Sequence, residues 1–340
     1  MEEQIKKGAN PPKKEKTSRA PITPISEPAL PILLAAVVFA VCFIALLINK
    51  FIYPFGDELL APVILQIVAL VIPAYLVIML TLSGKSLFSQ MKAIGFRAIR
   101  AEHVFFVIFA ALFASCASLM LTLAFGGAQD ASSGVTLLGT FTAGENEYLV
   151  SIPYIILVYA VIPALAEELL YRGVIFKGLE KVSFPFAAVV STAVSALSGF
   201  TLGGLIPSLF IGILSVFVLY TTRSLWACVI LHFVFNIYRL FLETNISAYF
   251  LASSNNLLLI ITVVLALALS ALLFFSESAR IFRNRAEKIQ NRETKSEKRF
   301  GAIKSIPDDI RAALAFKPTL VCSIICLGIF IATVIINYVI

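Results

Sequence analysis

The sequence predicts an all-α fold: a polytopic transmembrane helical bundle of about nine spans, with its N-terminus inside. Two facts of composition support this prediction, because 59% of the residues are hydrophobic and only 14% are charged. A soluble domain has about 45–50% apolar and about 25% charged residues. The third observation is a series of apolar runs of about 20 residues, the length that crosses a hydrocarbon core of about 30 Å. We therefore expect an integral, multi-pass membrane protein.

The apolar runs give the expected order of the spans. The fourth run is unusual because it contains charged residues, and the fifth and sixth are joined by a short turn at Gly203-Gly204. The expected spans cover residues 31–52, 61–82, 103–125, 149–175, 184–202, 205–222, 225–241, 256–275 and 319–340.

Connections that are rich in lysine and arginine alternate along the chain with connections that contain few of them. The tail before the first span holds six of them, segment 83–102 holds four and segment 276–317 holds eleven. Segment 126–148 holds none, although it contains three acidic residues. Because positive residues are retained on the inner side of a membrane, this alternation predicts the N-terminus inside and the C-terminus outside.

Changes of composition divide the chain into a core and flanking elements. The tail is basic and rich in proline, which predicts disorder. Segment 276–317 mixes basic and apolar residues, which fits either a helix lying on the inner leaflet or a charged linker helix. We expect a disordered basic cytosolic tail at 1–27, an N-terminal helical hairpin at 28–84, the core at 85–245, an additional span at 246–275, a basic cytosolic segment at 276–317 and a C-terminal span at 318–340.

The net charge of +7 does not indicate a nucleic-acid partner. The basic residues flank apolar spans, where positive charge sets topology, and they lack interleaved aromatic residues for stacking on bases. The five cysteines all fall inside apolar runs. They are interpreted as small buried hydrophobic residues and not as a disulfide framework or a thiolate metal site.

The most costly residues to place in a membrane lie in the fourth span. Glu167, Glu168 and Arg172 occur inside an apolar run, and each ionised group there needs a partner or water. Glu168 and Arg172 are four residues apart, so on a helix they share one face and can pair. Glu167 lies about 100° around the helix and has no evident local partner. Glu167 is therefore the residue whose presence needs an explanation.

A second polar cluster lies in the seventh span. His232 and Asn236 are also four residues apart and share one helix face. One interpretation is structural: the polar groups of the two spans satisfy one another and fix the packing of the helices. The other is a water-filled catalytic cavity, in which Glu167 is a general base and His232 and Asn236 donate hydrogen bonds to an oxyanion. A transporter would also place charges at this depth, but the sequence has no inverted repeat that would favour one.

The two clusters resemble a known family. Segment 167–173, Glu-Glu-Leu-Leu-Tyr-Arg-Gly, fits the EExxxR signature of the CAAX protease and bacteriocin-processing (CPBP) family of intramembrane proteases. Segment 232–236, His-Phe-Val-Phe-Asn, resembles the last motif of that family, HxxxN. Segment 212–226 is similar to the helix hairpin that leads into this motif, and segment 85–97 looks like the basic stretch before the core. The resemblance covers residues 85–245 and implies an intramembrane protease core there.

The resemblance implies a role for each motif residue. Glu167 activates water for peptide hydrolysis, Glu168 and Arg172 form the supporting pair, and His232 and Asn236 form the oxyanion site. The implied partners are the lipid bilayer and a membrane-associated peptide or membrane protein, with no nucleic acid. The implied location is a bacterial cytoplasmic membrane.

The resemblance leaves the cofactor open. The family is described as metallo-endopeptidases, which implies zinc, and a metal-free mechanism with a glutamate base is the alternative. The metal ligands would be Glu167 and His232, and this set is incomplete because a catalytic zinc ion takes about three protein ligands. No cofactor is therefore assigned.

The middle motif of the family, FxxxH, is absent. Its phenylalanine and histidine would fall at Ser195 and Gly199, and no histidine occurs between Arg172 and His232. Two functions stay open. The first is an intramembrane endopeptidase that hydrolyses a membrane-associated peptide. The second is a catalytically silent scaffold of the same fold that regulates a partner protein, as in members resembling lysostaphin-resistance protein A.

Overall fold

The computed structural model describes residues 29–47, 60–125, 152–180, 183–198, 202–253, 255–293 and 317–339. Every regular element in these residues is a helix, which confirms the predicted all-α class. The α-helices are α1 (Ala29–Leu47), α2 (Leu60–Gln66), α3 (Ile72–Thr81), α4 (Leu87–Ile94), α5 (Val104–Phe125), α7 (Ile152–Ile156), α8 (Ile162–Glu168), α9 (Lys177–Leu179), α10 (Phe184–Leu197), α11 (Leu202–Thr222), α12 (Leu225–Tyr238), α13 (Thr244–Ala252), α14 (Leu257–Glu293) and α16 (Lys317–Val339). Short π segments join some of them: η2 (Ile67–Val71), η4 (Leu157–Val161), η5 (Leu169–Phe176) and η6 (Arg239–Glu243), and the 3₁₀ turn η3 (Ala101–His103) precedes α5.

Each expected span coincides with an apolar helix in the described part of the chain. Six of these helices are long and apolar enough to cross a membrane, and the other three are shorter within the described residues. The total of nine spans and the inside position of the N-terminus stay predictions. The tail at 1–27 and the acidic segment at 126–148 lie outside the described residues. Helix α14 continues without a break through residue 275, so the expected boundary between the eighth span and the basic segment falls inside one helix.

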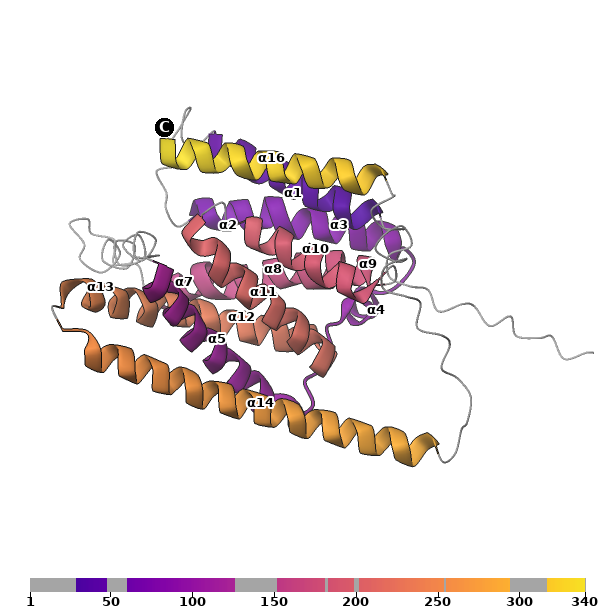
Figure 1. Ribbon diagram of the computed structural model, residues 1–340. Coiled ribbons are helices and arrows are strands. Elements are labelled where there is room, and N and C mark those ends of the chain that lie inside the picture. Colours follow the sequence, from indigo (N-terminus) through magenta and orange to yellow (C-terminus); the bar gives the residue numbers. More distant parts are fainter. Residues whose placement is uncertain are drawn as a thin grey trace, which may run out of the picture.

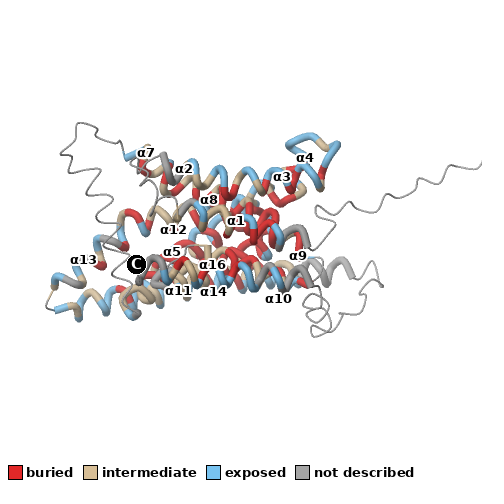
Figure 2. The backbone as a smooth tube through the Cα atoms, turned by 90° about the horizontal axis from the view of Figure 1, so that it is seen from above, coloured by how far each residue is buried: buried red, intermediate tan, exposed pale blue. Residues whose placement is uncertain are grey.

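The helices form one bundle, shown in Figure 1. The first and last described helices, α1 and α16, pack together along one side of it, and α14 packs on α5 along the opposite side. Between them lie α8, η5, α10, α11 and α12, and the two polar clusters are on α8 and η5 and on α12. Figure 2 shows that buried residues gather in this central region, whereas α14 and α4 expose much of their surface.

The π segments η2 and η4 have a local cause. Pro73 and Pro163 each follow one of these segments at the start of the next α-helix. A proline lacks the amide hydrogen of the normal helical bond, and its ring clashes with the carbonyl one turn earlier. The wider turn accommodates this defect, because the amides of Ile72 and Ile162 bond to carbonyls five residues back instead of four.

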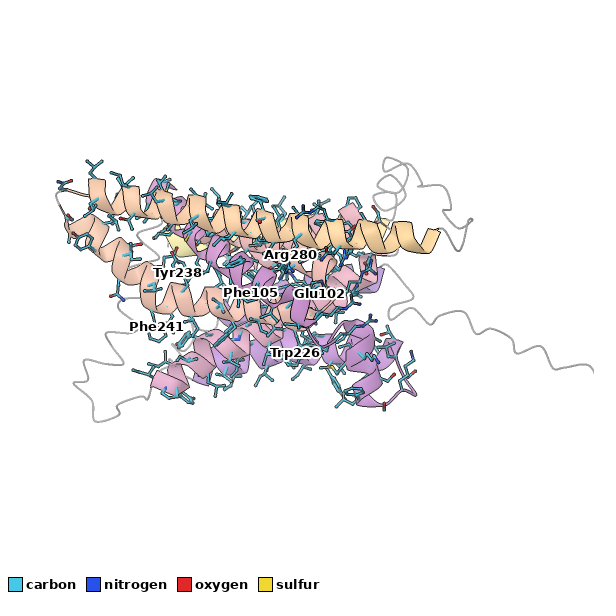
Figure 3. All side chains as sticks on the ribbon, turned by 90° about the horizontal axis from the view of Figure 1, so that it is seen from below. Glu102, Phe105, Trp226, Tyr238, Phe241 and Arg280 are labelled. Carbon is cyan, nitrogen blue, oxygen red and sulfur yellow. The ribbon has the colours of Figure 1, made fainter. Side chains whose placement is uncertain are left out.

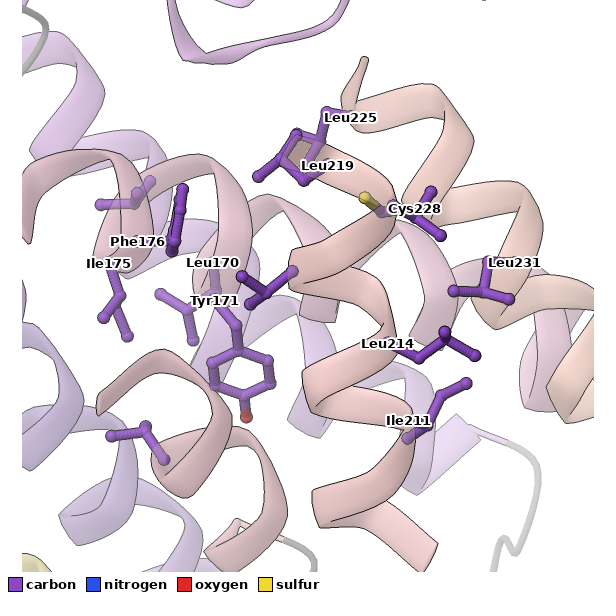
Figure 4. Close-up of a cluster of buried hydrophobic side chains, with 14 of the residues drawn as sticks. Leu170, Tyr171, Ile175, Phe176, Ile211, Leu214, Leu219, Leu225, Cys228 and Leu231 are labelled. Carbon is purple, nitrogen blue, oxygen red and sulfur yellow. The ribbon is translucent and has the colours of Figure 1, made fainter. Parts of the chain in front are cut away.

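Buried, mostly apolar side chains from η5, α11 and α12 form the core beside the polar clusters. Figure 4 shows Tyr171, Leu214 and Leu231 among the residues that these elements contribute. All three are buried. Such packing holds the helices at fixed distances, because protein interiors are close-packed with few voids.

Gly212 sets the distance between α10 and α11. A Cβ at this position would lie 2.8 Å from Cγ2 of Thr192 and 3.4 Å from Nη2 of Arg172. We expect Gly212→Ala to destabilise the protein by about 1–3 kcal/mol, because overpacking forces the two helices apart. Thermal unfolding in one detergent measures this effect.

Two further variants control the Gly212 test. Thr192→Ser removes the clashing methyl group, so it restores most of the lost stability when combined with Gly212→Ala. Gly328→Ala places a methyl group in α16 where no atom lies within 4 Å, so it leaves stability unchanged or raises it. A Gly212→Ala variant as stable as Gly328→Ala would contradict the close approach of α10 and α11.

Candidate functional site

Glu168 and Arg172 form a buried ion pair. Nη1 of Arg172 lies 3.3 Å from Oε1 of Glu168, and the two side chains are 1% and 0% exposed. This is the pairing that the four-residue spacing predicts. Arg172 also donates to the hydroxyl of Ser195 at 3.2 Å and to the carbonyl of Gly212 at 3.4 Å. The guanidinium therefore links η5 to both α10 and α11.

His232 contacts both glutamates from α12. Its Nδ1 lies 2.9 Å from Oε1 of Glu168, and its Nε2 lies 3.7 Å from Oε2 of Glu167. Because a carboxylate can only accept, Nδ1 donates its proton to Glu168 and the ring orientation is fixed. Nε2 is then directed toward Glu167. The two motifs, which are 65 positions apart from Glu167 to His232, thus meet in space.

The charges of this cluster balance when His232 carries two protons. Glu167, Glu168, Arg172 and an imidazolium at His232 then sum to zero. Neutrality and direct pairing limit the cost of holding ionised groups at membrane depth. Ser215 of α11 adds a donor, because its hydroxyl lies 3.3 Å from Oε1 of Glu168.

Glu167 differs from Glu168 in its exposure. Its side chain is 27% exposed, whereas that of Glu168 is fully buried. Both line one cavity of about 170 Å³, together with His232 and Asn236. A cavity of this size holds several water molecules. Its full lining is Glu167, Glu168, Arg172, Ser195, Ser198, Ser208, Ile211, His232, Phe235, Asn236 and Arg239.

All five residues predicted from the sequence therefore line this cavity, and several further polar residues do too. Arg239 lies two helical turns from His232, or about 10 Å along the helix. It pairs with Glu243 at 3.3 Å, and Glu243 accepts hydrogen bonds from Ser118 and Thr122 of α5. The sequence contains a signal for Arg239, since residues 232, 236 and 239 follow the spacing of one helix face.

Serine residues occupy the region of the missing middle motif. The hydroxyl of Tyr171 donates to Oγ of Ser198 at 2.7 Å, and Ser198 donates to the carbonyl of Ser195 at 2.8 Å. Ser195 itself accepts from Arg172. Both serines are thus held by protein partners on the cavity wall. Gly199, where the histidine is expected, lies outside the described residues.

The described residues do not fit a catalytic zinc ion. A catalytic zinc is held by about three protein ligands with one open position. Within the ranges that the structure describes, no group of three His, Cys, Asp or Glu side chains is placed to hold a metal ion. Glu167 and His232 supply two donors, and Oε1 of Glu168 already accepts from Arg172, Ser215 and His232. No chemical step is assigned to a metal here.

Comparison with known proteins adds one finding. Residues 149–238 match the family model described as Rce1-like, type II CAAX prenyl endopeptidase Rce1-like. This segment contains α8, η5 and α12 and therefore every residue of the two motifs. The chain matches no curated protein and no solved structure.

Proposed function

The chain belongs to the CAAX protease and bacteriocin-processing family through residues 149–238, and from this premise we propose that it is an intramembrane endopeptidase with Glu167 as general base. The observation that carries the proposal is the position of Glu167. Its carboxylate is partly exposed in the cavity and lies 3.7 Å from Nε2 of His232, while the neighbouring Glu168 is buried and binds Arg172, Ser215 and His232 through Oε1. One carboxylate is thus available for chemistry, and the other is structural.

In the proposed reaction, water in the cavity loses a proton to Glu167 and attacks the peptide carbonyl carbon. The carbonyl oxygen becomes an oxyanion, and hydrogen-bond donors preorganised around it lower the barrier. His232, doubly protonated, donates from Nε2, and Asn236 donates from its side-chain amide. Glu167 then returns the proton to the leaving nitrogen as the carbon–nitrogen bond breaks.

Glu168 and Arg172 act on this reaction through His232. Because Glu168 accepts the proton of Nδ1, the imidazole presents Nε2 to the cavity in both of its protonation states. Arg172 and Ser215 hold the carboxylate of Glu168 in place. These residues are therefore positioning residues in the proposal, and Glu167, His232 and Asn236 are the catalytic ones.

The proposed substrate is a membrane-associated peptide. The matching family is described by its action on prenylated CAAX proteins, in which the lipid is attached to a cysteine close to the C-terminus. The cavity lies among apolar helices, several of them long enough to cross a membrane, so a lipid-anchored or hydrophobic peptide suits it.

A second candidate function is a silent scaffold that regulates a partner membrane protein. It is favoured by the loss of the middle-motif histidine, with glycine at position 199. Ser195 and Ser198, which are four residues and one residue before this position, already have protein partners. In this function the polar cluster serves packing alone, and Glu167 is dispensable.

Analysis of new C-termini tests the proposed function and identifies the substrate in the same experiment. Membranes are prepared from cells that express the wild-type chain or Glu167→Gln at equal levels, and C-terminal peptides are identified by mass spectrometry. We expect one or a few membrane proteins to carry a new C-terminus only with the wild-type chain. Synthetic versions of that segment, with and without a prenylated cysteine, then define the substrate. Identical termini in both membranes would support the scaffold.

A further inference from the structure

A second polar cavity lies where α11 turns into α12. Its volume is about 440 Å³, and its lining includes Arg100, Arg223 and Arg285 with no carboxylate among the described lining residues. Tyr220 and Phe282 supply aromatic faces. A smaller cavity beside it is lined by Arg280 and by the carboxylate of Glu102. Arg100 pairs with Glu102 at 3.5 Å, whereas Arg223 and Arg285 repel one another across this space, so an anion bound between them would offset the repulsion.

Arg223 has an unusual backbone. It is the only residue other than glycine with a positive φ, 56°, among the residues that the structure describes. This left-handed conformation is strained for a side chain of this kind, and glycine or asparagine is the usual occupant. An arginine held in such a turn suggests that its guanidinium has a function there.

The turn is fixed on both sides of Arg223. The hydroxyl of Thr222 accepts from the amide of Ser224 at 3.2 Å, and the amide of Leu225 donates to the carbonyl of Gly95 at 2.8 Å. The hydroxyl of Ser224 donates to the carbonyl of Arg97. Arg223 is therefore presented from a rigid turn, which reduces the entropy lost when it binds a ligand.

The other arginines differ in how far they are already neutralised. Arg280 is already neutralised, because it lies 2.5 Å from Oε2 of Glu277, and it also donates to the carbonyl of Glu102 (Figure 3). Arg285 donates to the carbonyl of Thr221 and lies over the ring of Phe282. In the described part of the chain, neither Arg223 nor Arg285 forms an ion pair with a carboxylate. These two cations are available to an anionic ligand.

The depth of the cavity indicates the source of the anion. Leu205–Thr222 and Leu225–Ser247 are two of the six candidate spans, and Arg223 is in the turn between them. A turn between two spans lies at the membrane–water interface, which is where lipid phosphates are found and where tyrosine side chains such as Tyr220 are enriched. Basic pockets between membrane helices on the cytoplasmic side of a membrane bind the headgroups of anionic lipids.

We propose that this cavity binds the phosphate headgroup of an anionic membrane lipid, with Arg223 and Arg285 as its principal ligands. The planar guanidinium fork matches phosphate oxygens in pairs, which a single ammonium group does not. The proposal is independent of peptide hydrolysis, because none of these residues lines the cavity of Glu167.

The test titrates the purified full chain in detergent micelles with phosphatidylglycerol or with phosphatidylcholine. Trp226 is the only tryptophan of the chain and lies three positions from Arg223, so its fluorescence is the readout. We expect phosphatidylglycerol to change this fluorescence at concentrations where phosphatidylcholine does not. Arg223→Asn and Arg285→Gln should each weaken the binding about tenfold, because each removes a charge-assisted contact. Asparagine tolerates the left-handed conformation, so Arg223→Asn keeps the turn intact.

Arg283→Gln is the matched control, because Arg283 is exposed on α14 and lines neither cavity. It should bind phosphatidylglycerol as the wild type does. If Arg283→Gln weakens binding as much as Arg223→Asn, the effect is general surface charge and the proposal fails. If inorganic phosphate competes with phosphatidylglycerol at equal concentration, the cavity is a free-phosphate site and the lipid assignment is wrong. Equal responses to the two lipids would also overturn it.

Discussion

Glu167→Gln is expected to reduce peptide hydrolysis by about 10²–10⁴-fold, the contribution of a well-placed general base. Glutamine has nearly the same shape as glutamate, but its amide cannot take a proton from water. The variant should remain folded, because Glu167 is partly exposed in the cavity and its only described ion pair is the 3.7 Å contact with His232. Initial rates with the purified chain in proteoliposomes measure the effect.

Glu180→Gln is the control for this prediction. Glu180 belongs to the same described segment, but it is exposed and pairs with Lys177 at 2.6 Å, outside the cavity. It should hydrolyse peptide at the wild-type rate. A Glu167→Gln variant within about twofold of the wild type would remove the general base from the account. A Glu167→Gln variant that restores the phenotype of a deletion strain would favour the scaffold instead.

Arg172→Met is expected to cause the largest loss of stability, about 3–5 kcal/mol. Arg172 is 1% exposed and neutralises Glu168, which is fully buried. Without the guanidinium, the carboxylate loses its strongest partner, and the hydroxyl of Ser195 and the carbonyl of Gly212 lose a donor. Thermal unfolding of the purified variants in one detergent gives the difference.

A double variant separates the charge effect from simple loss of packing. Glu168→Gln together with Arg172→Met removes both charges, so it should recover part of the stability lost in Arg172→Met. It should nevertheless stay inactive, because His232 no longer donates Nδ1 to a carboxylate. If the double variant is less stable than Arg172→Met by the full effect of Glu168→Gln, the two residues are not coupled.

The fold class was predictable because a membrane constrains the chain so strongly. Backbone groups in hydrocarbon must be satisfied within the segment, so apolar runs of span length form helices. The details of those helices were not predictable from hydropathy. The π segments around Pro73 and Pro163 depend on how the local backbone relieves one missing hydrogen bond. The unbroken course of α14 past residue 275 likewise has no counterpart in the apolar pattern.

The site was predictable where the residues lie on one helix and not where helices meet. Spacing alone predicted the Glu168–Arg172 pair, which the structure contains. The bond from His232 to Glu168 joins two spans, and no periodicity within one span specifies it. Ser215 is a small residue on the face of Gly212, and its partner Glu168 becomes evident only when α11 and α8 both pack around α12. Interhelical contacts of this kind depend on the arrangement of the bundle.

Isotope labelling by the solvent tests the central claim most directly. Hydrolysis with Glu167 as general base transfers one oxygen from water to the new C-terminal carboxylate. In proteoliposomes prepared in H₂¹⁸O, the wild-type chain should release a product with a single ¹⁸O at that carboxylate. Glu167→Gln should release no labelled product in the same time, although it is folded. Labelled product formed equally by Glu167→Gln, or no labelled product from the wild-type chain on the substrate identified in cells, would contradict the account.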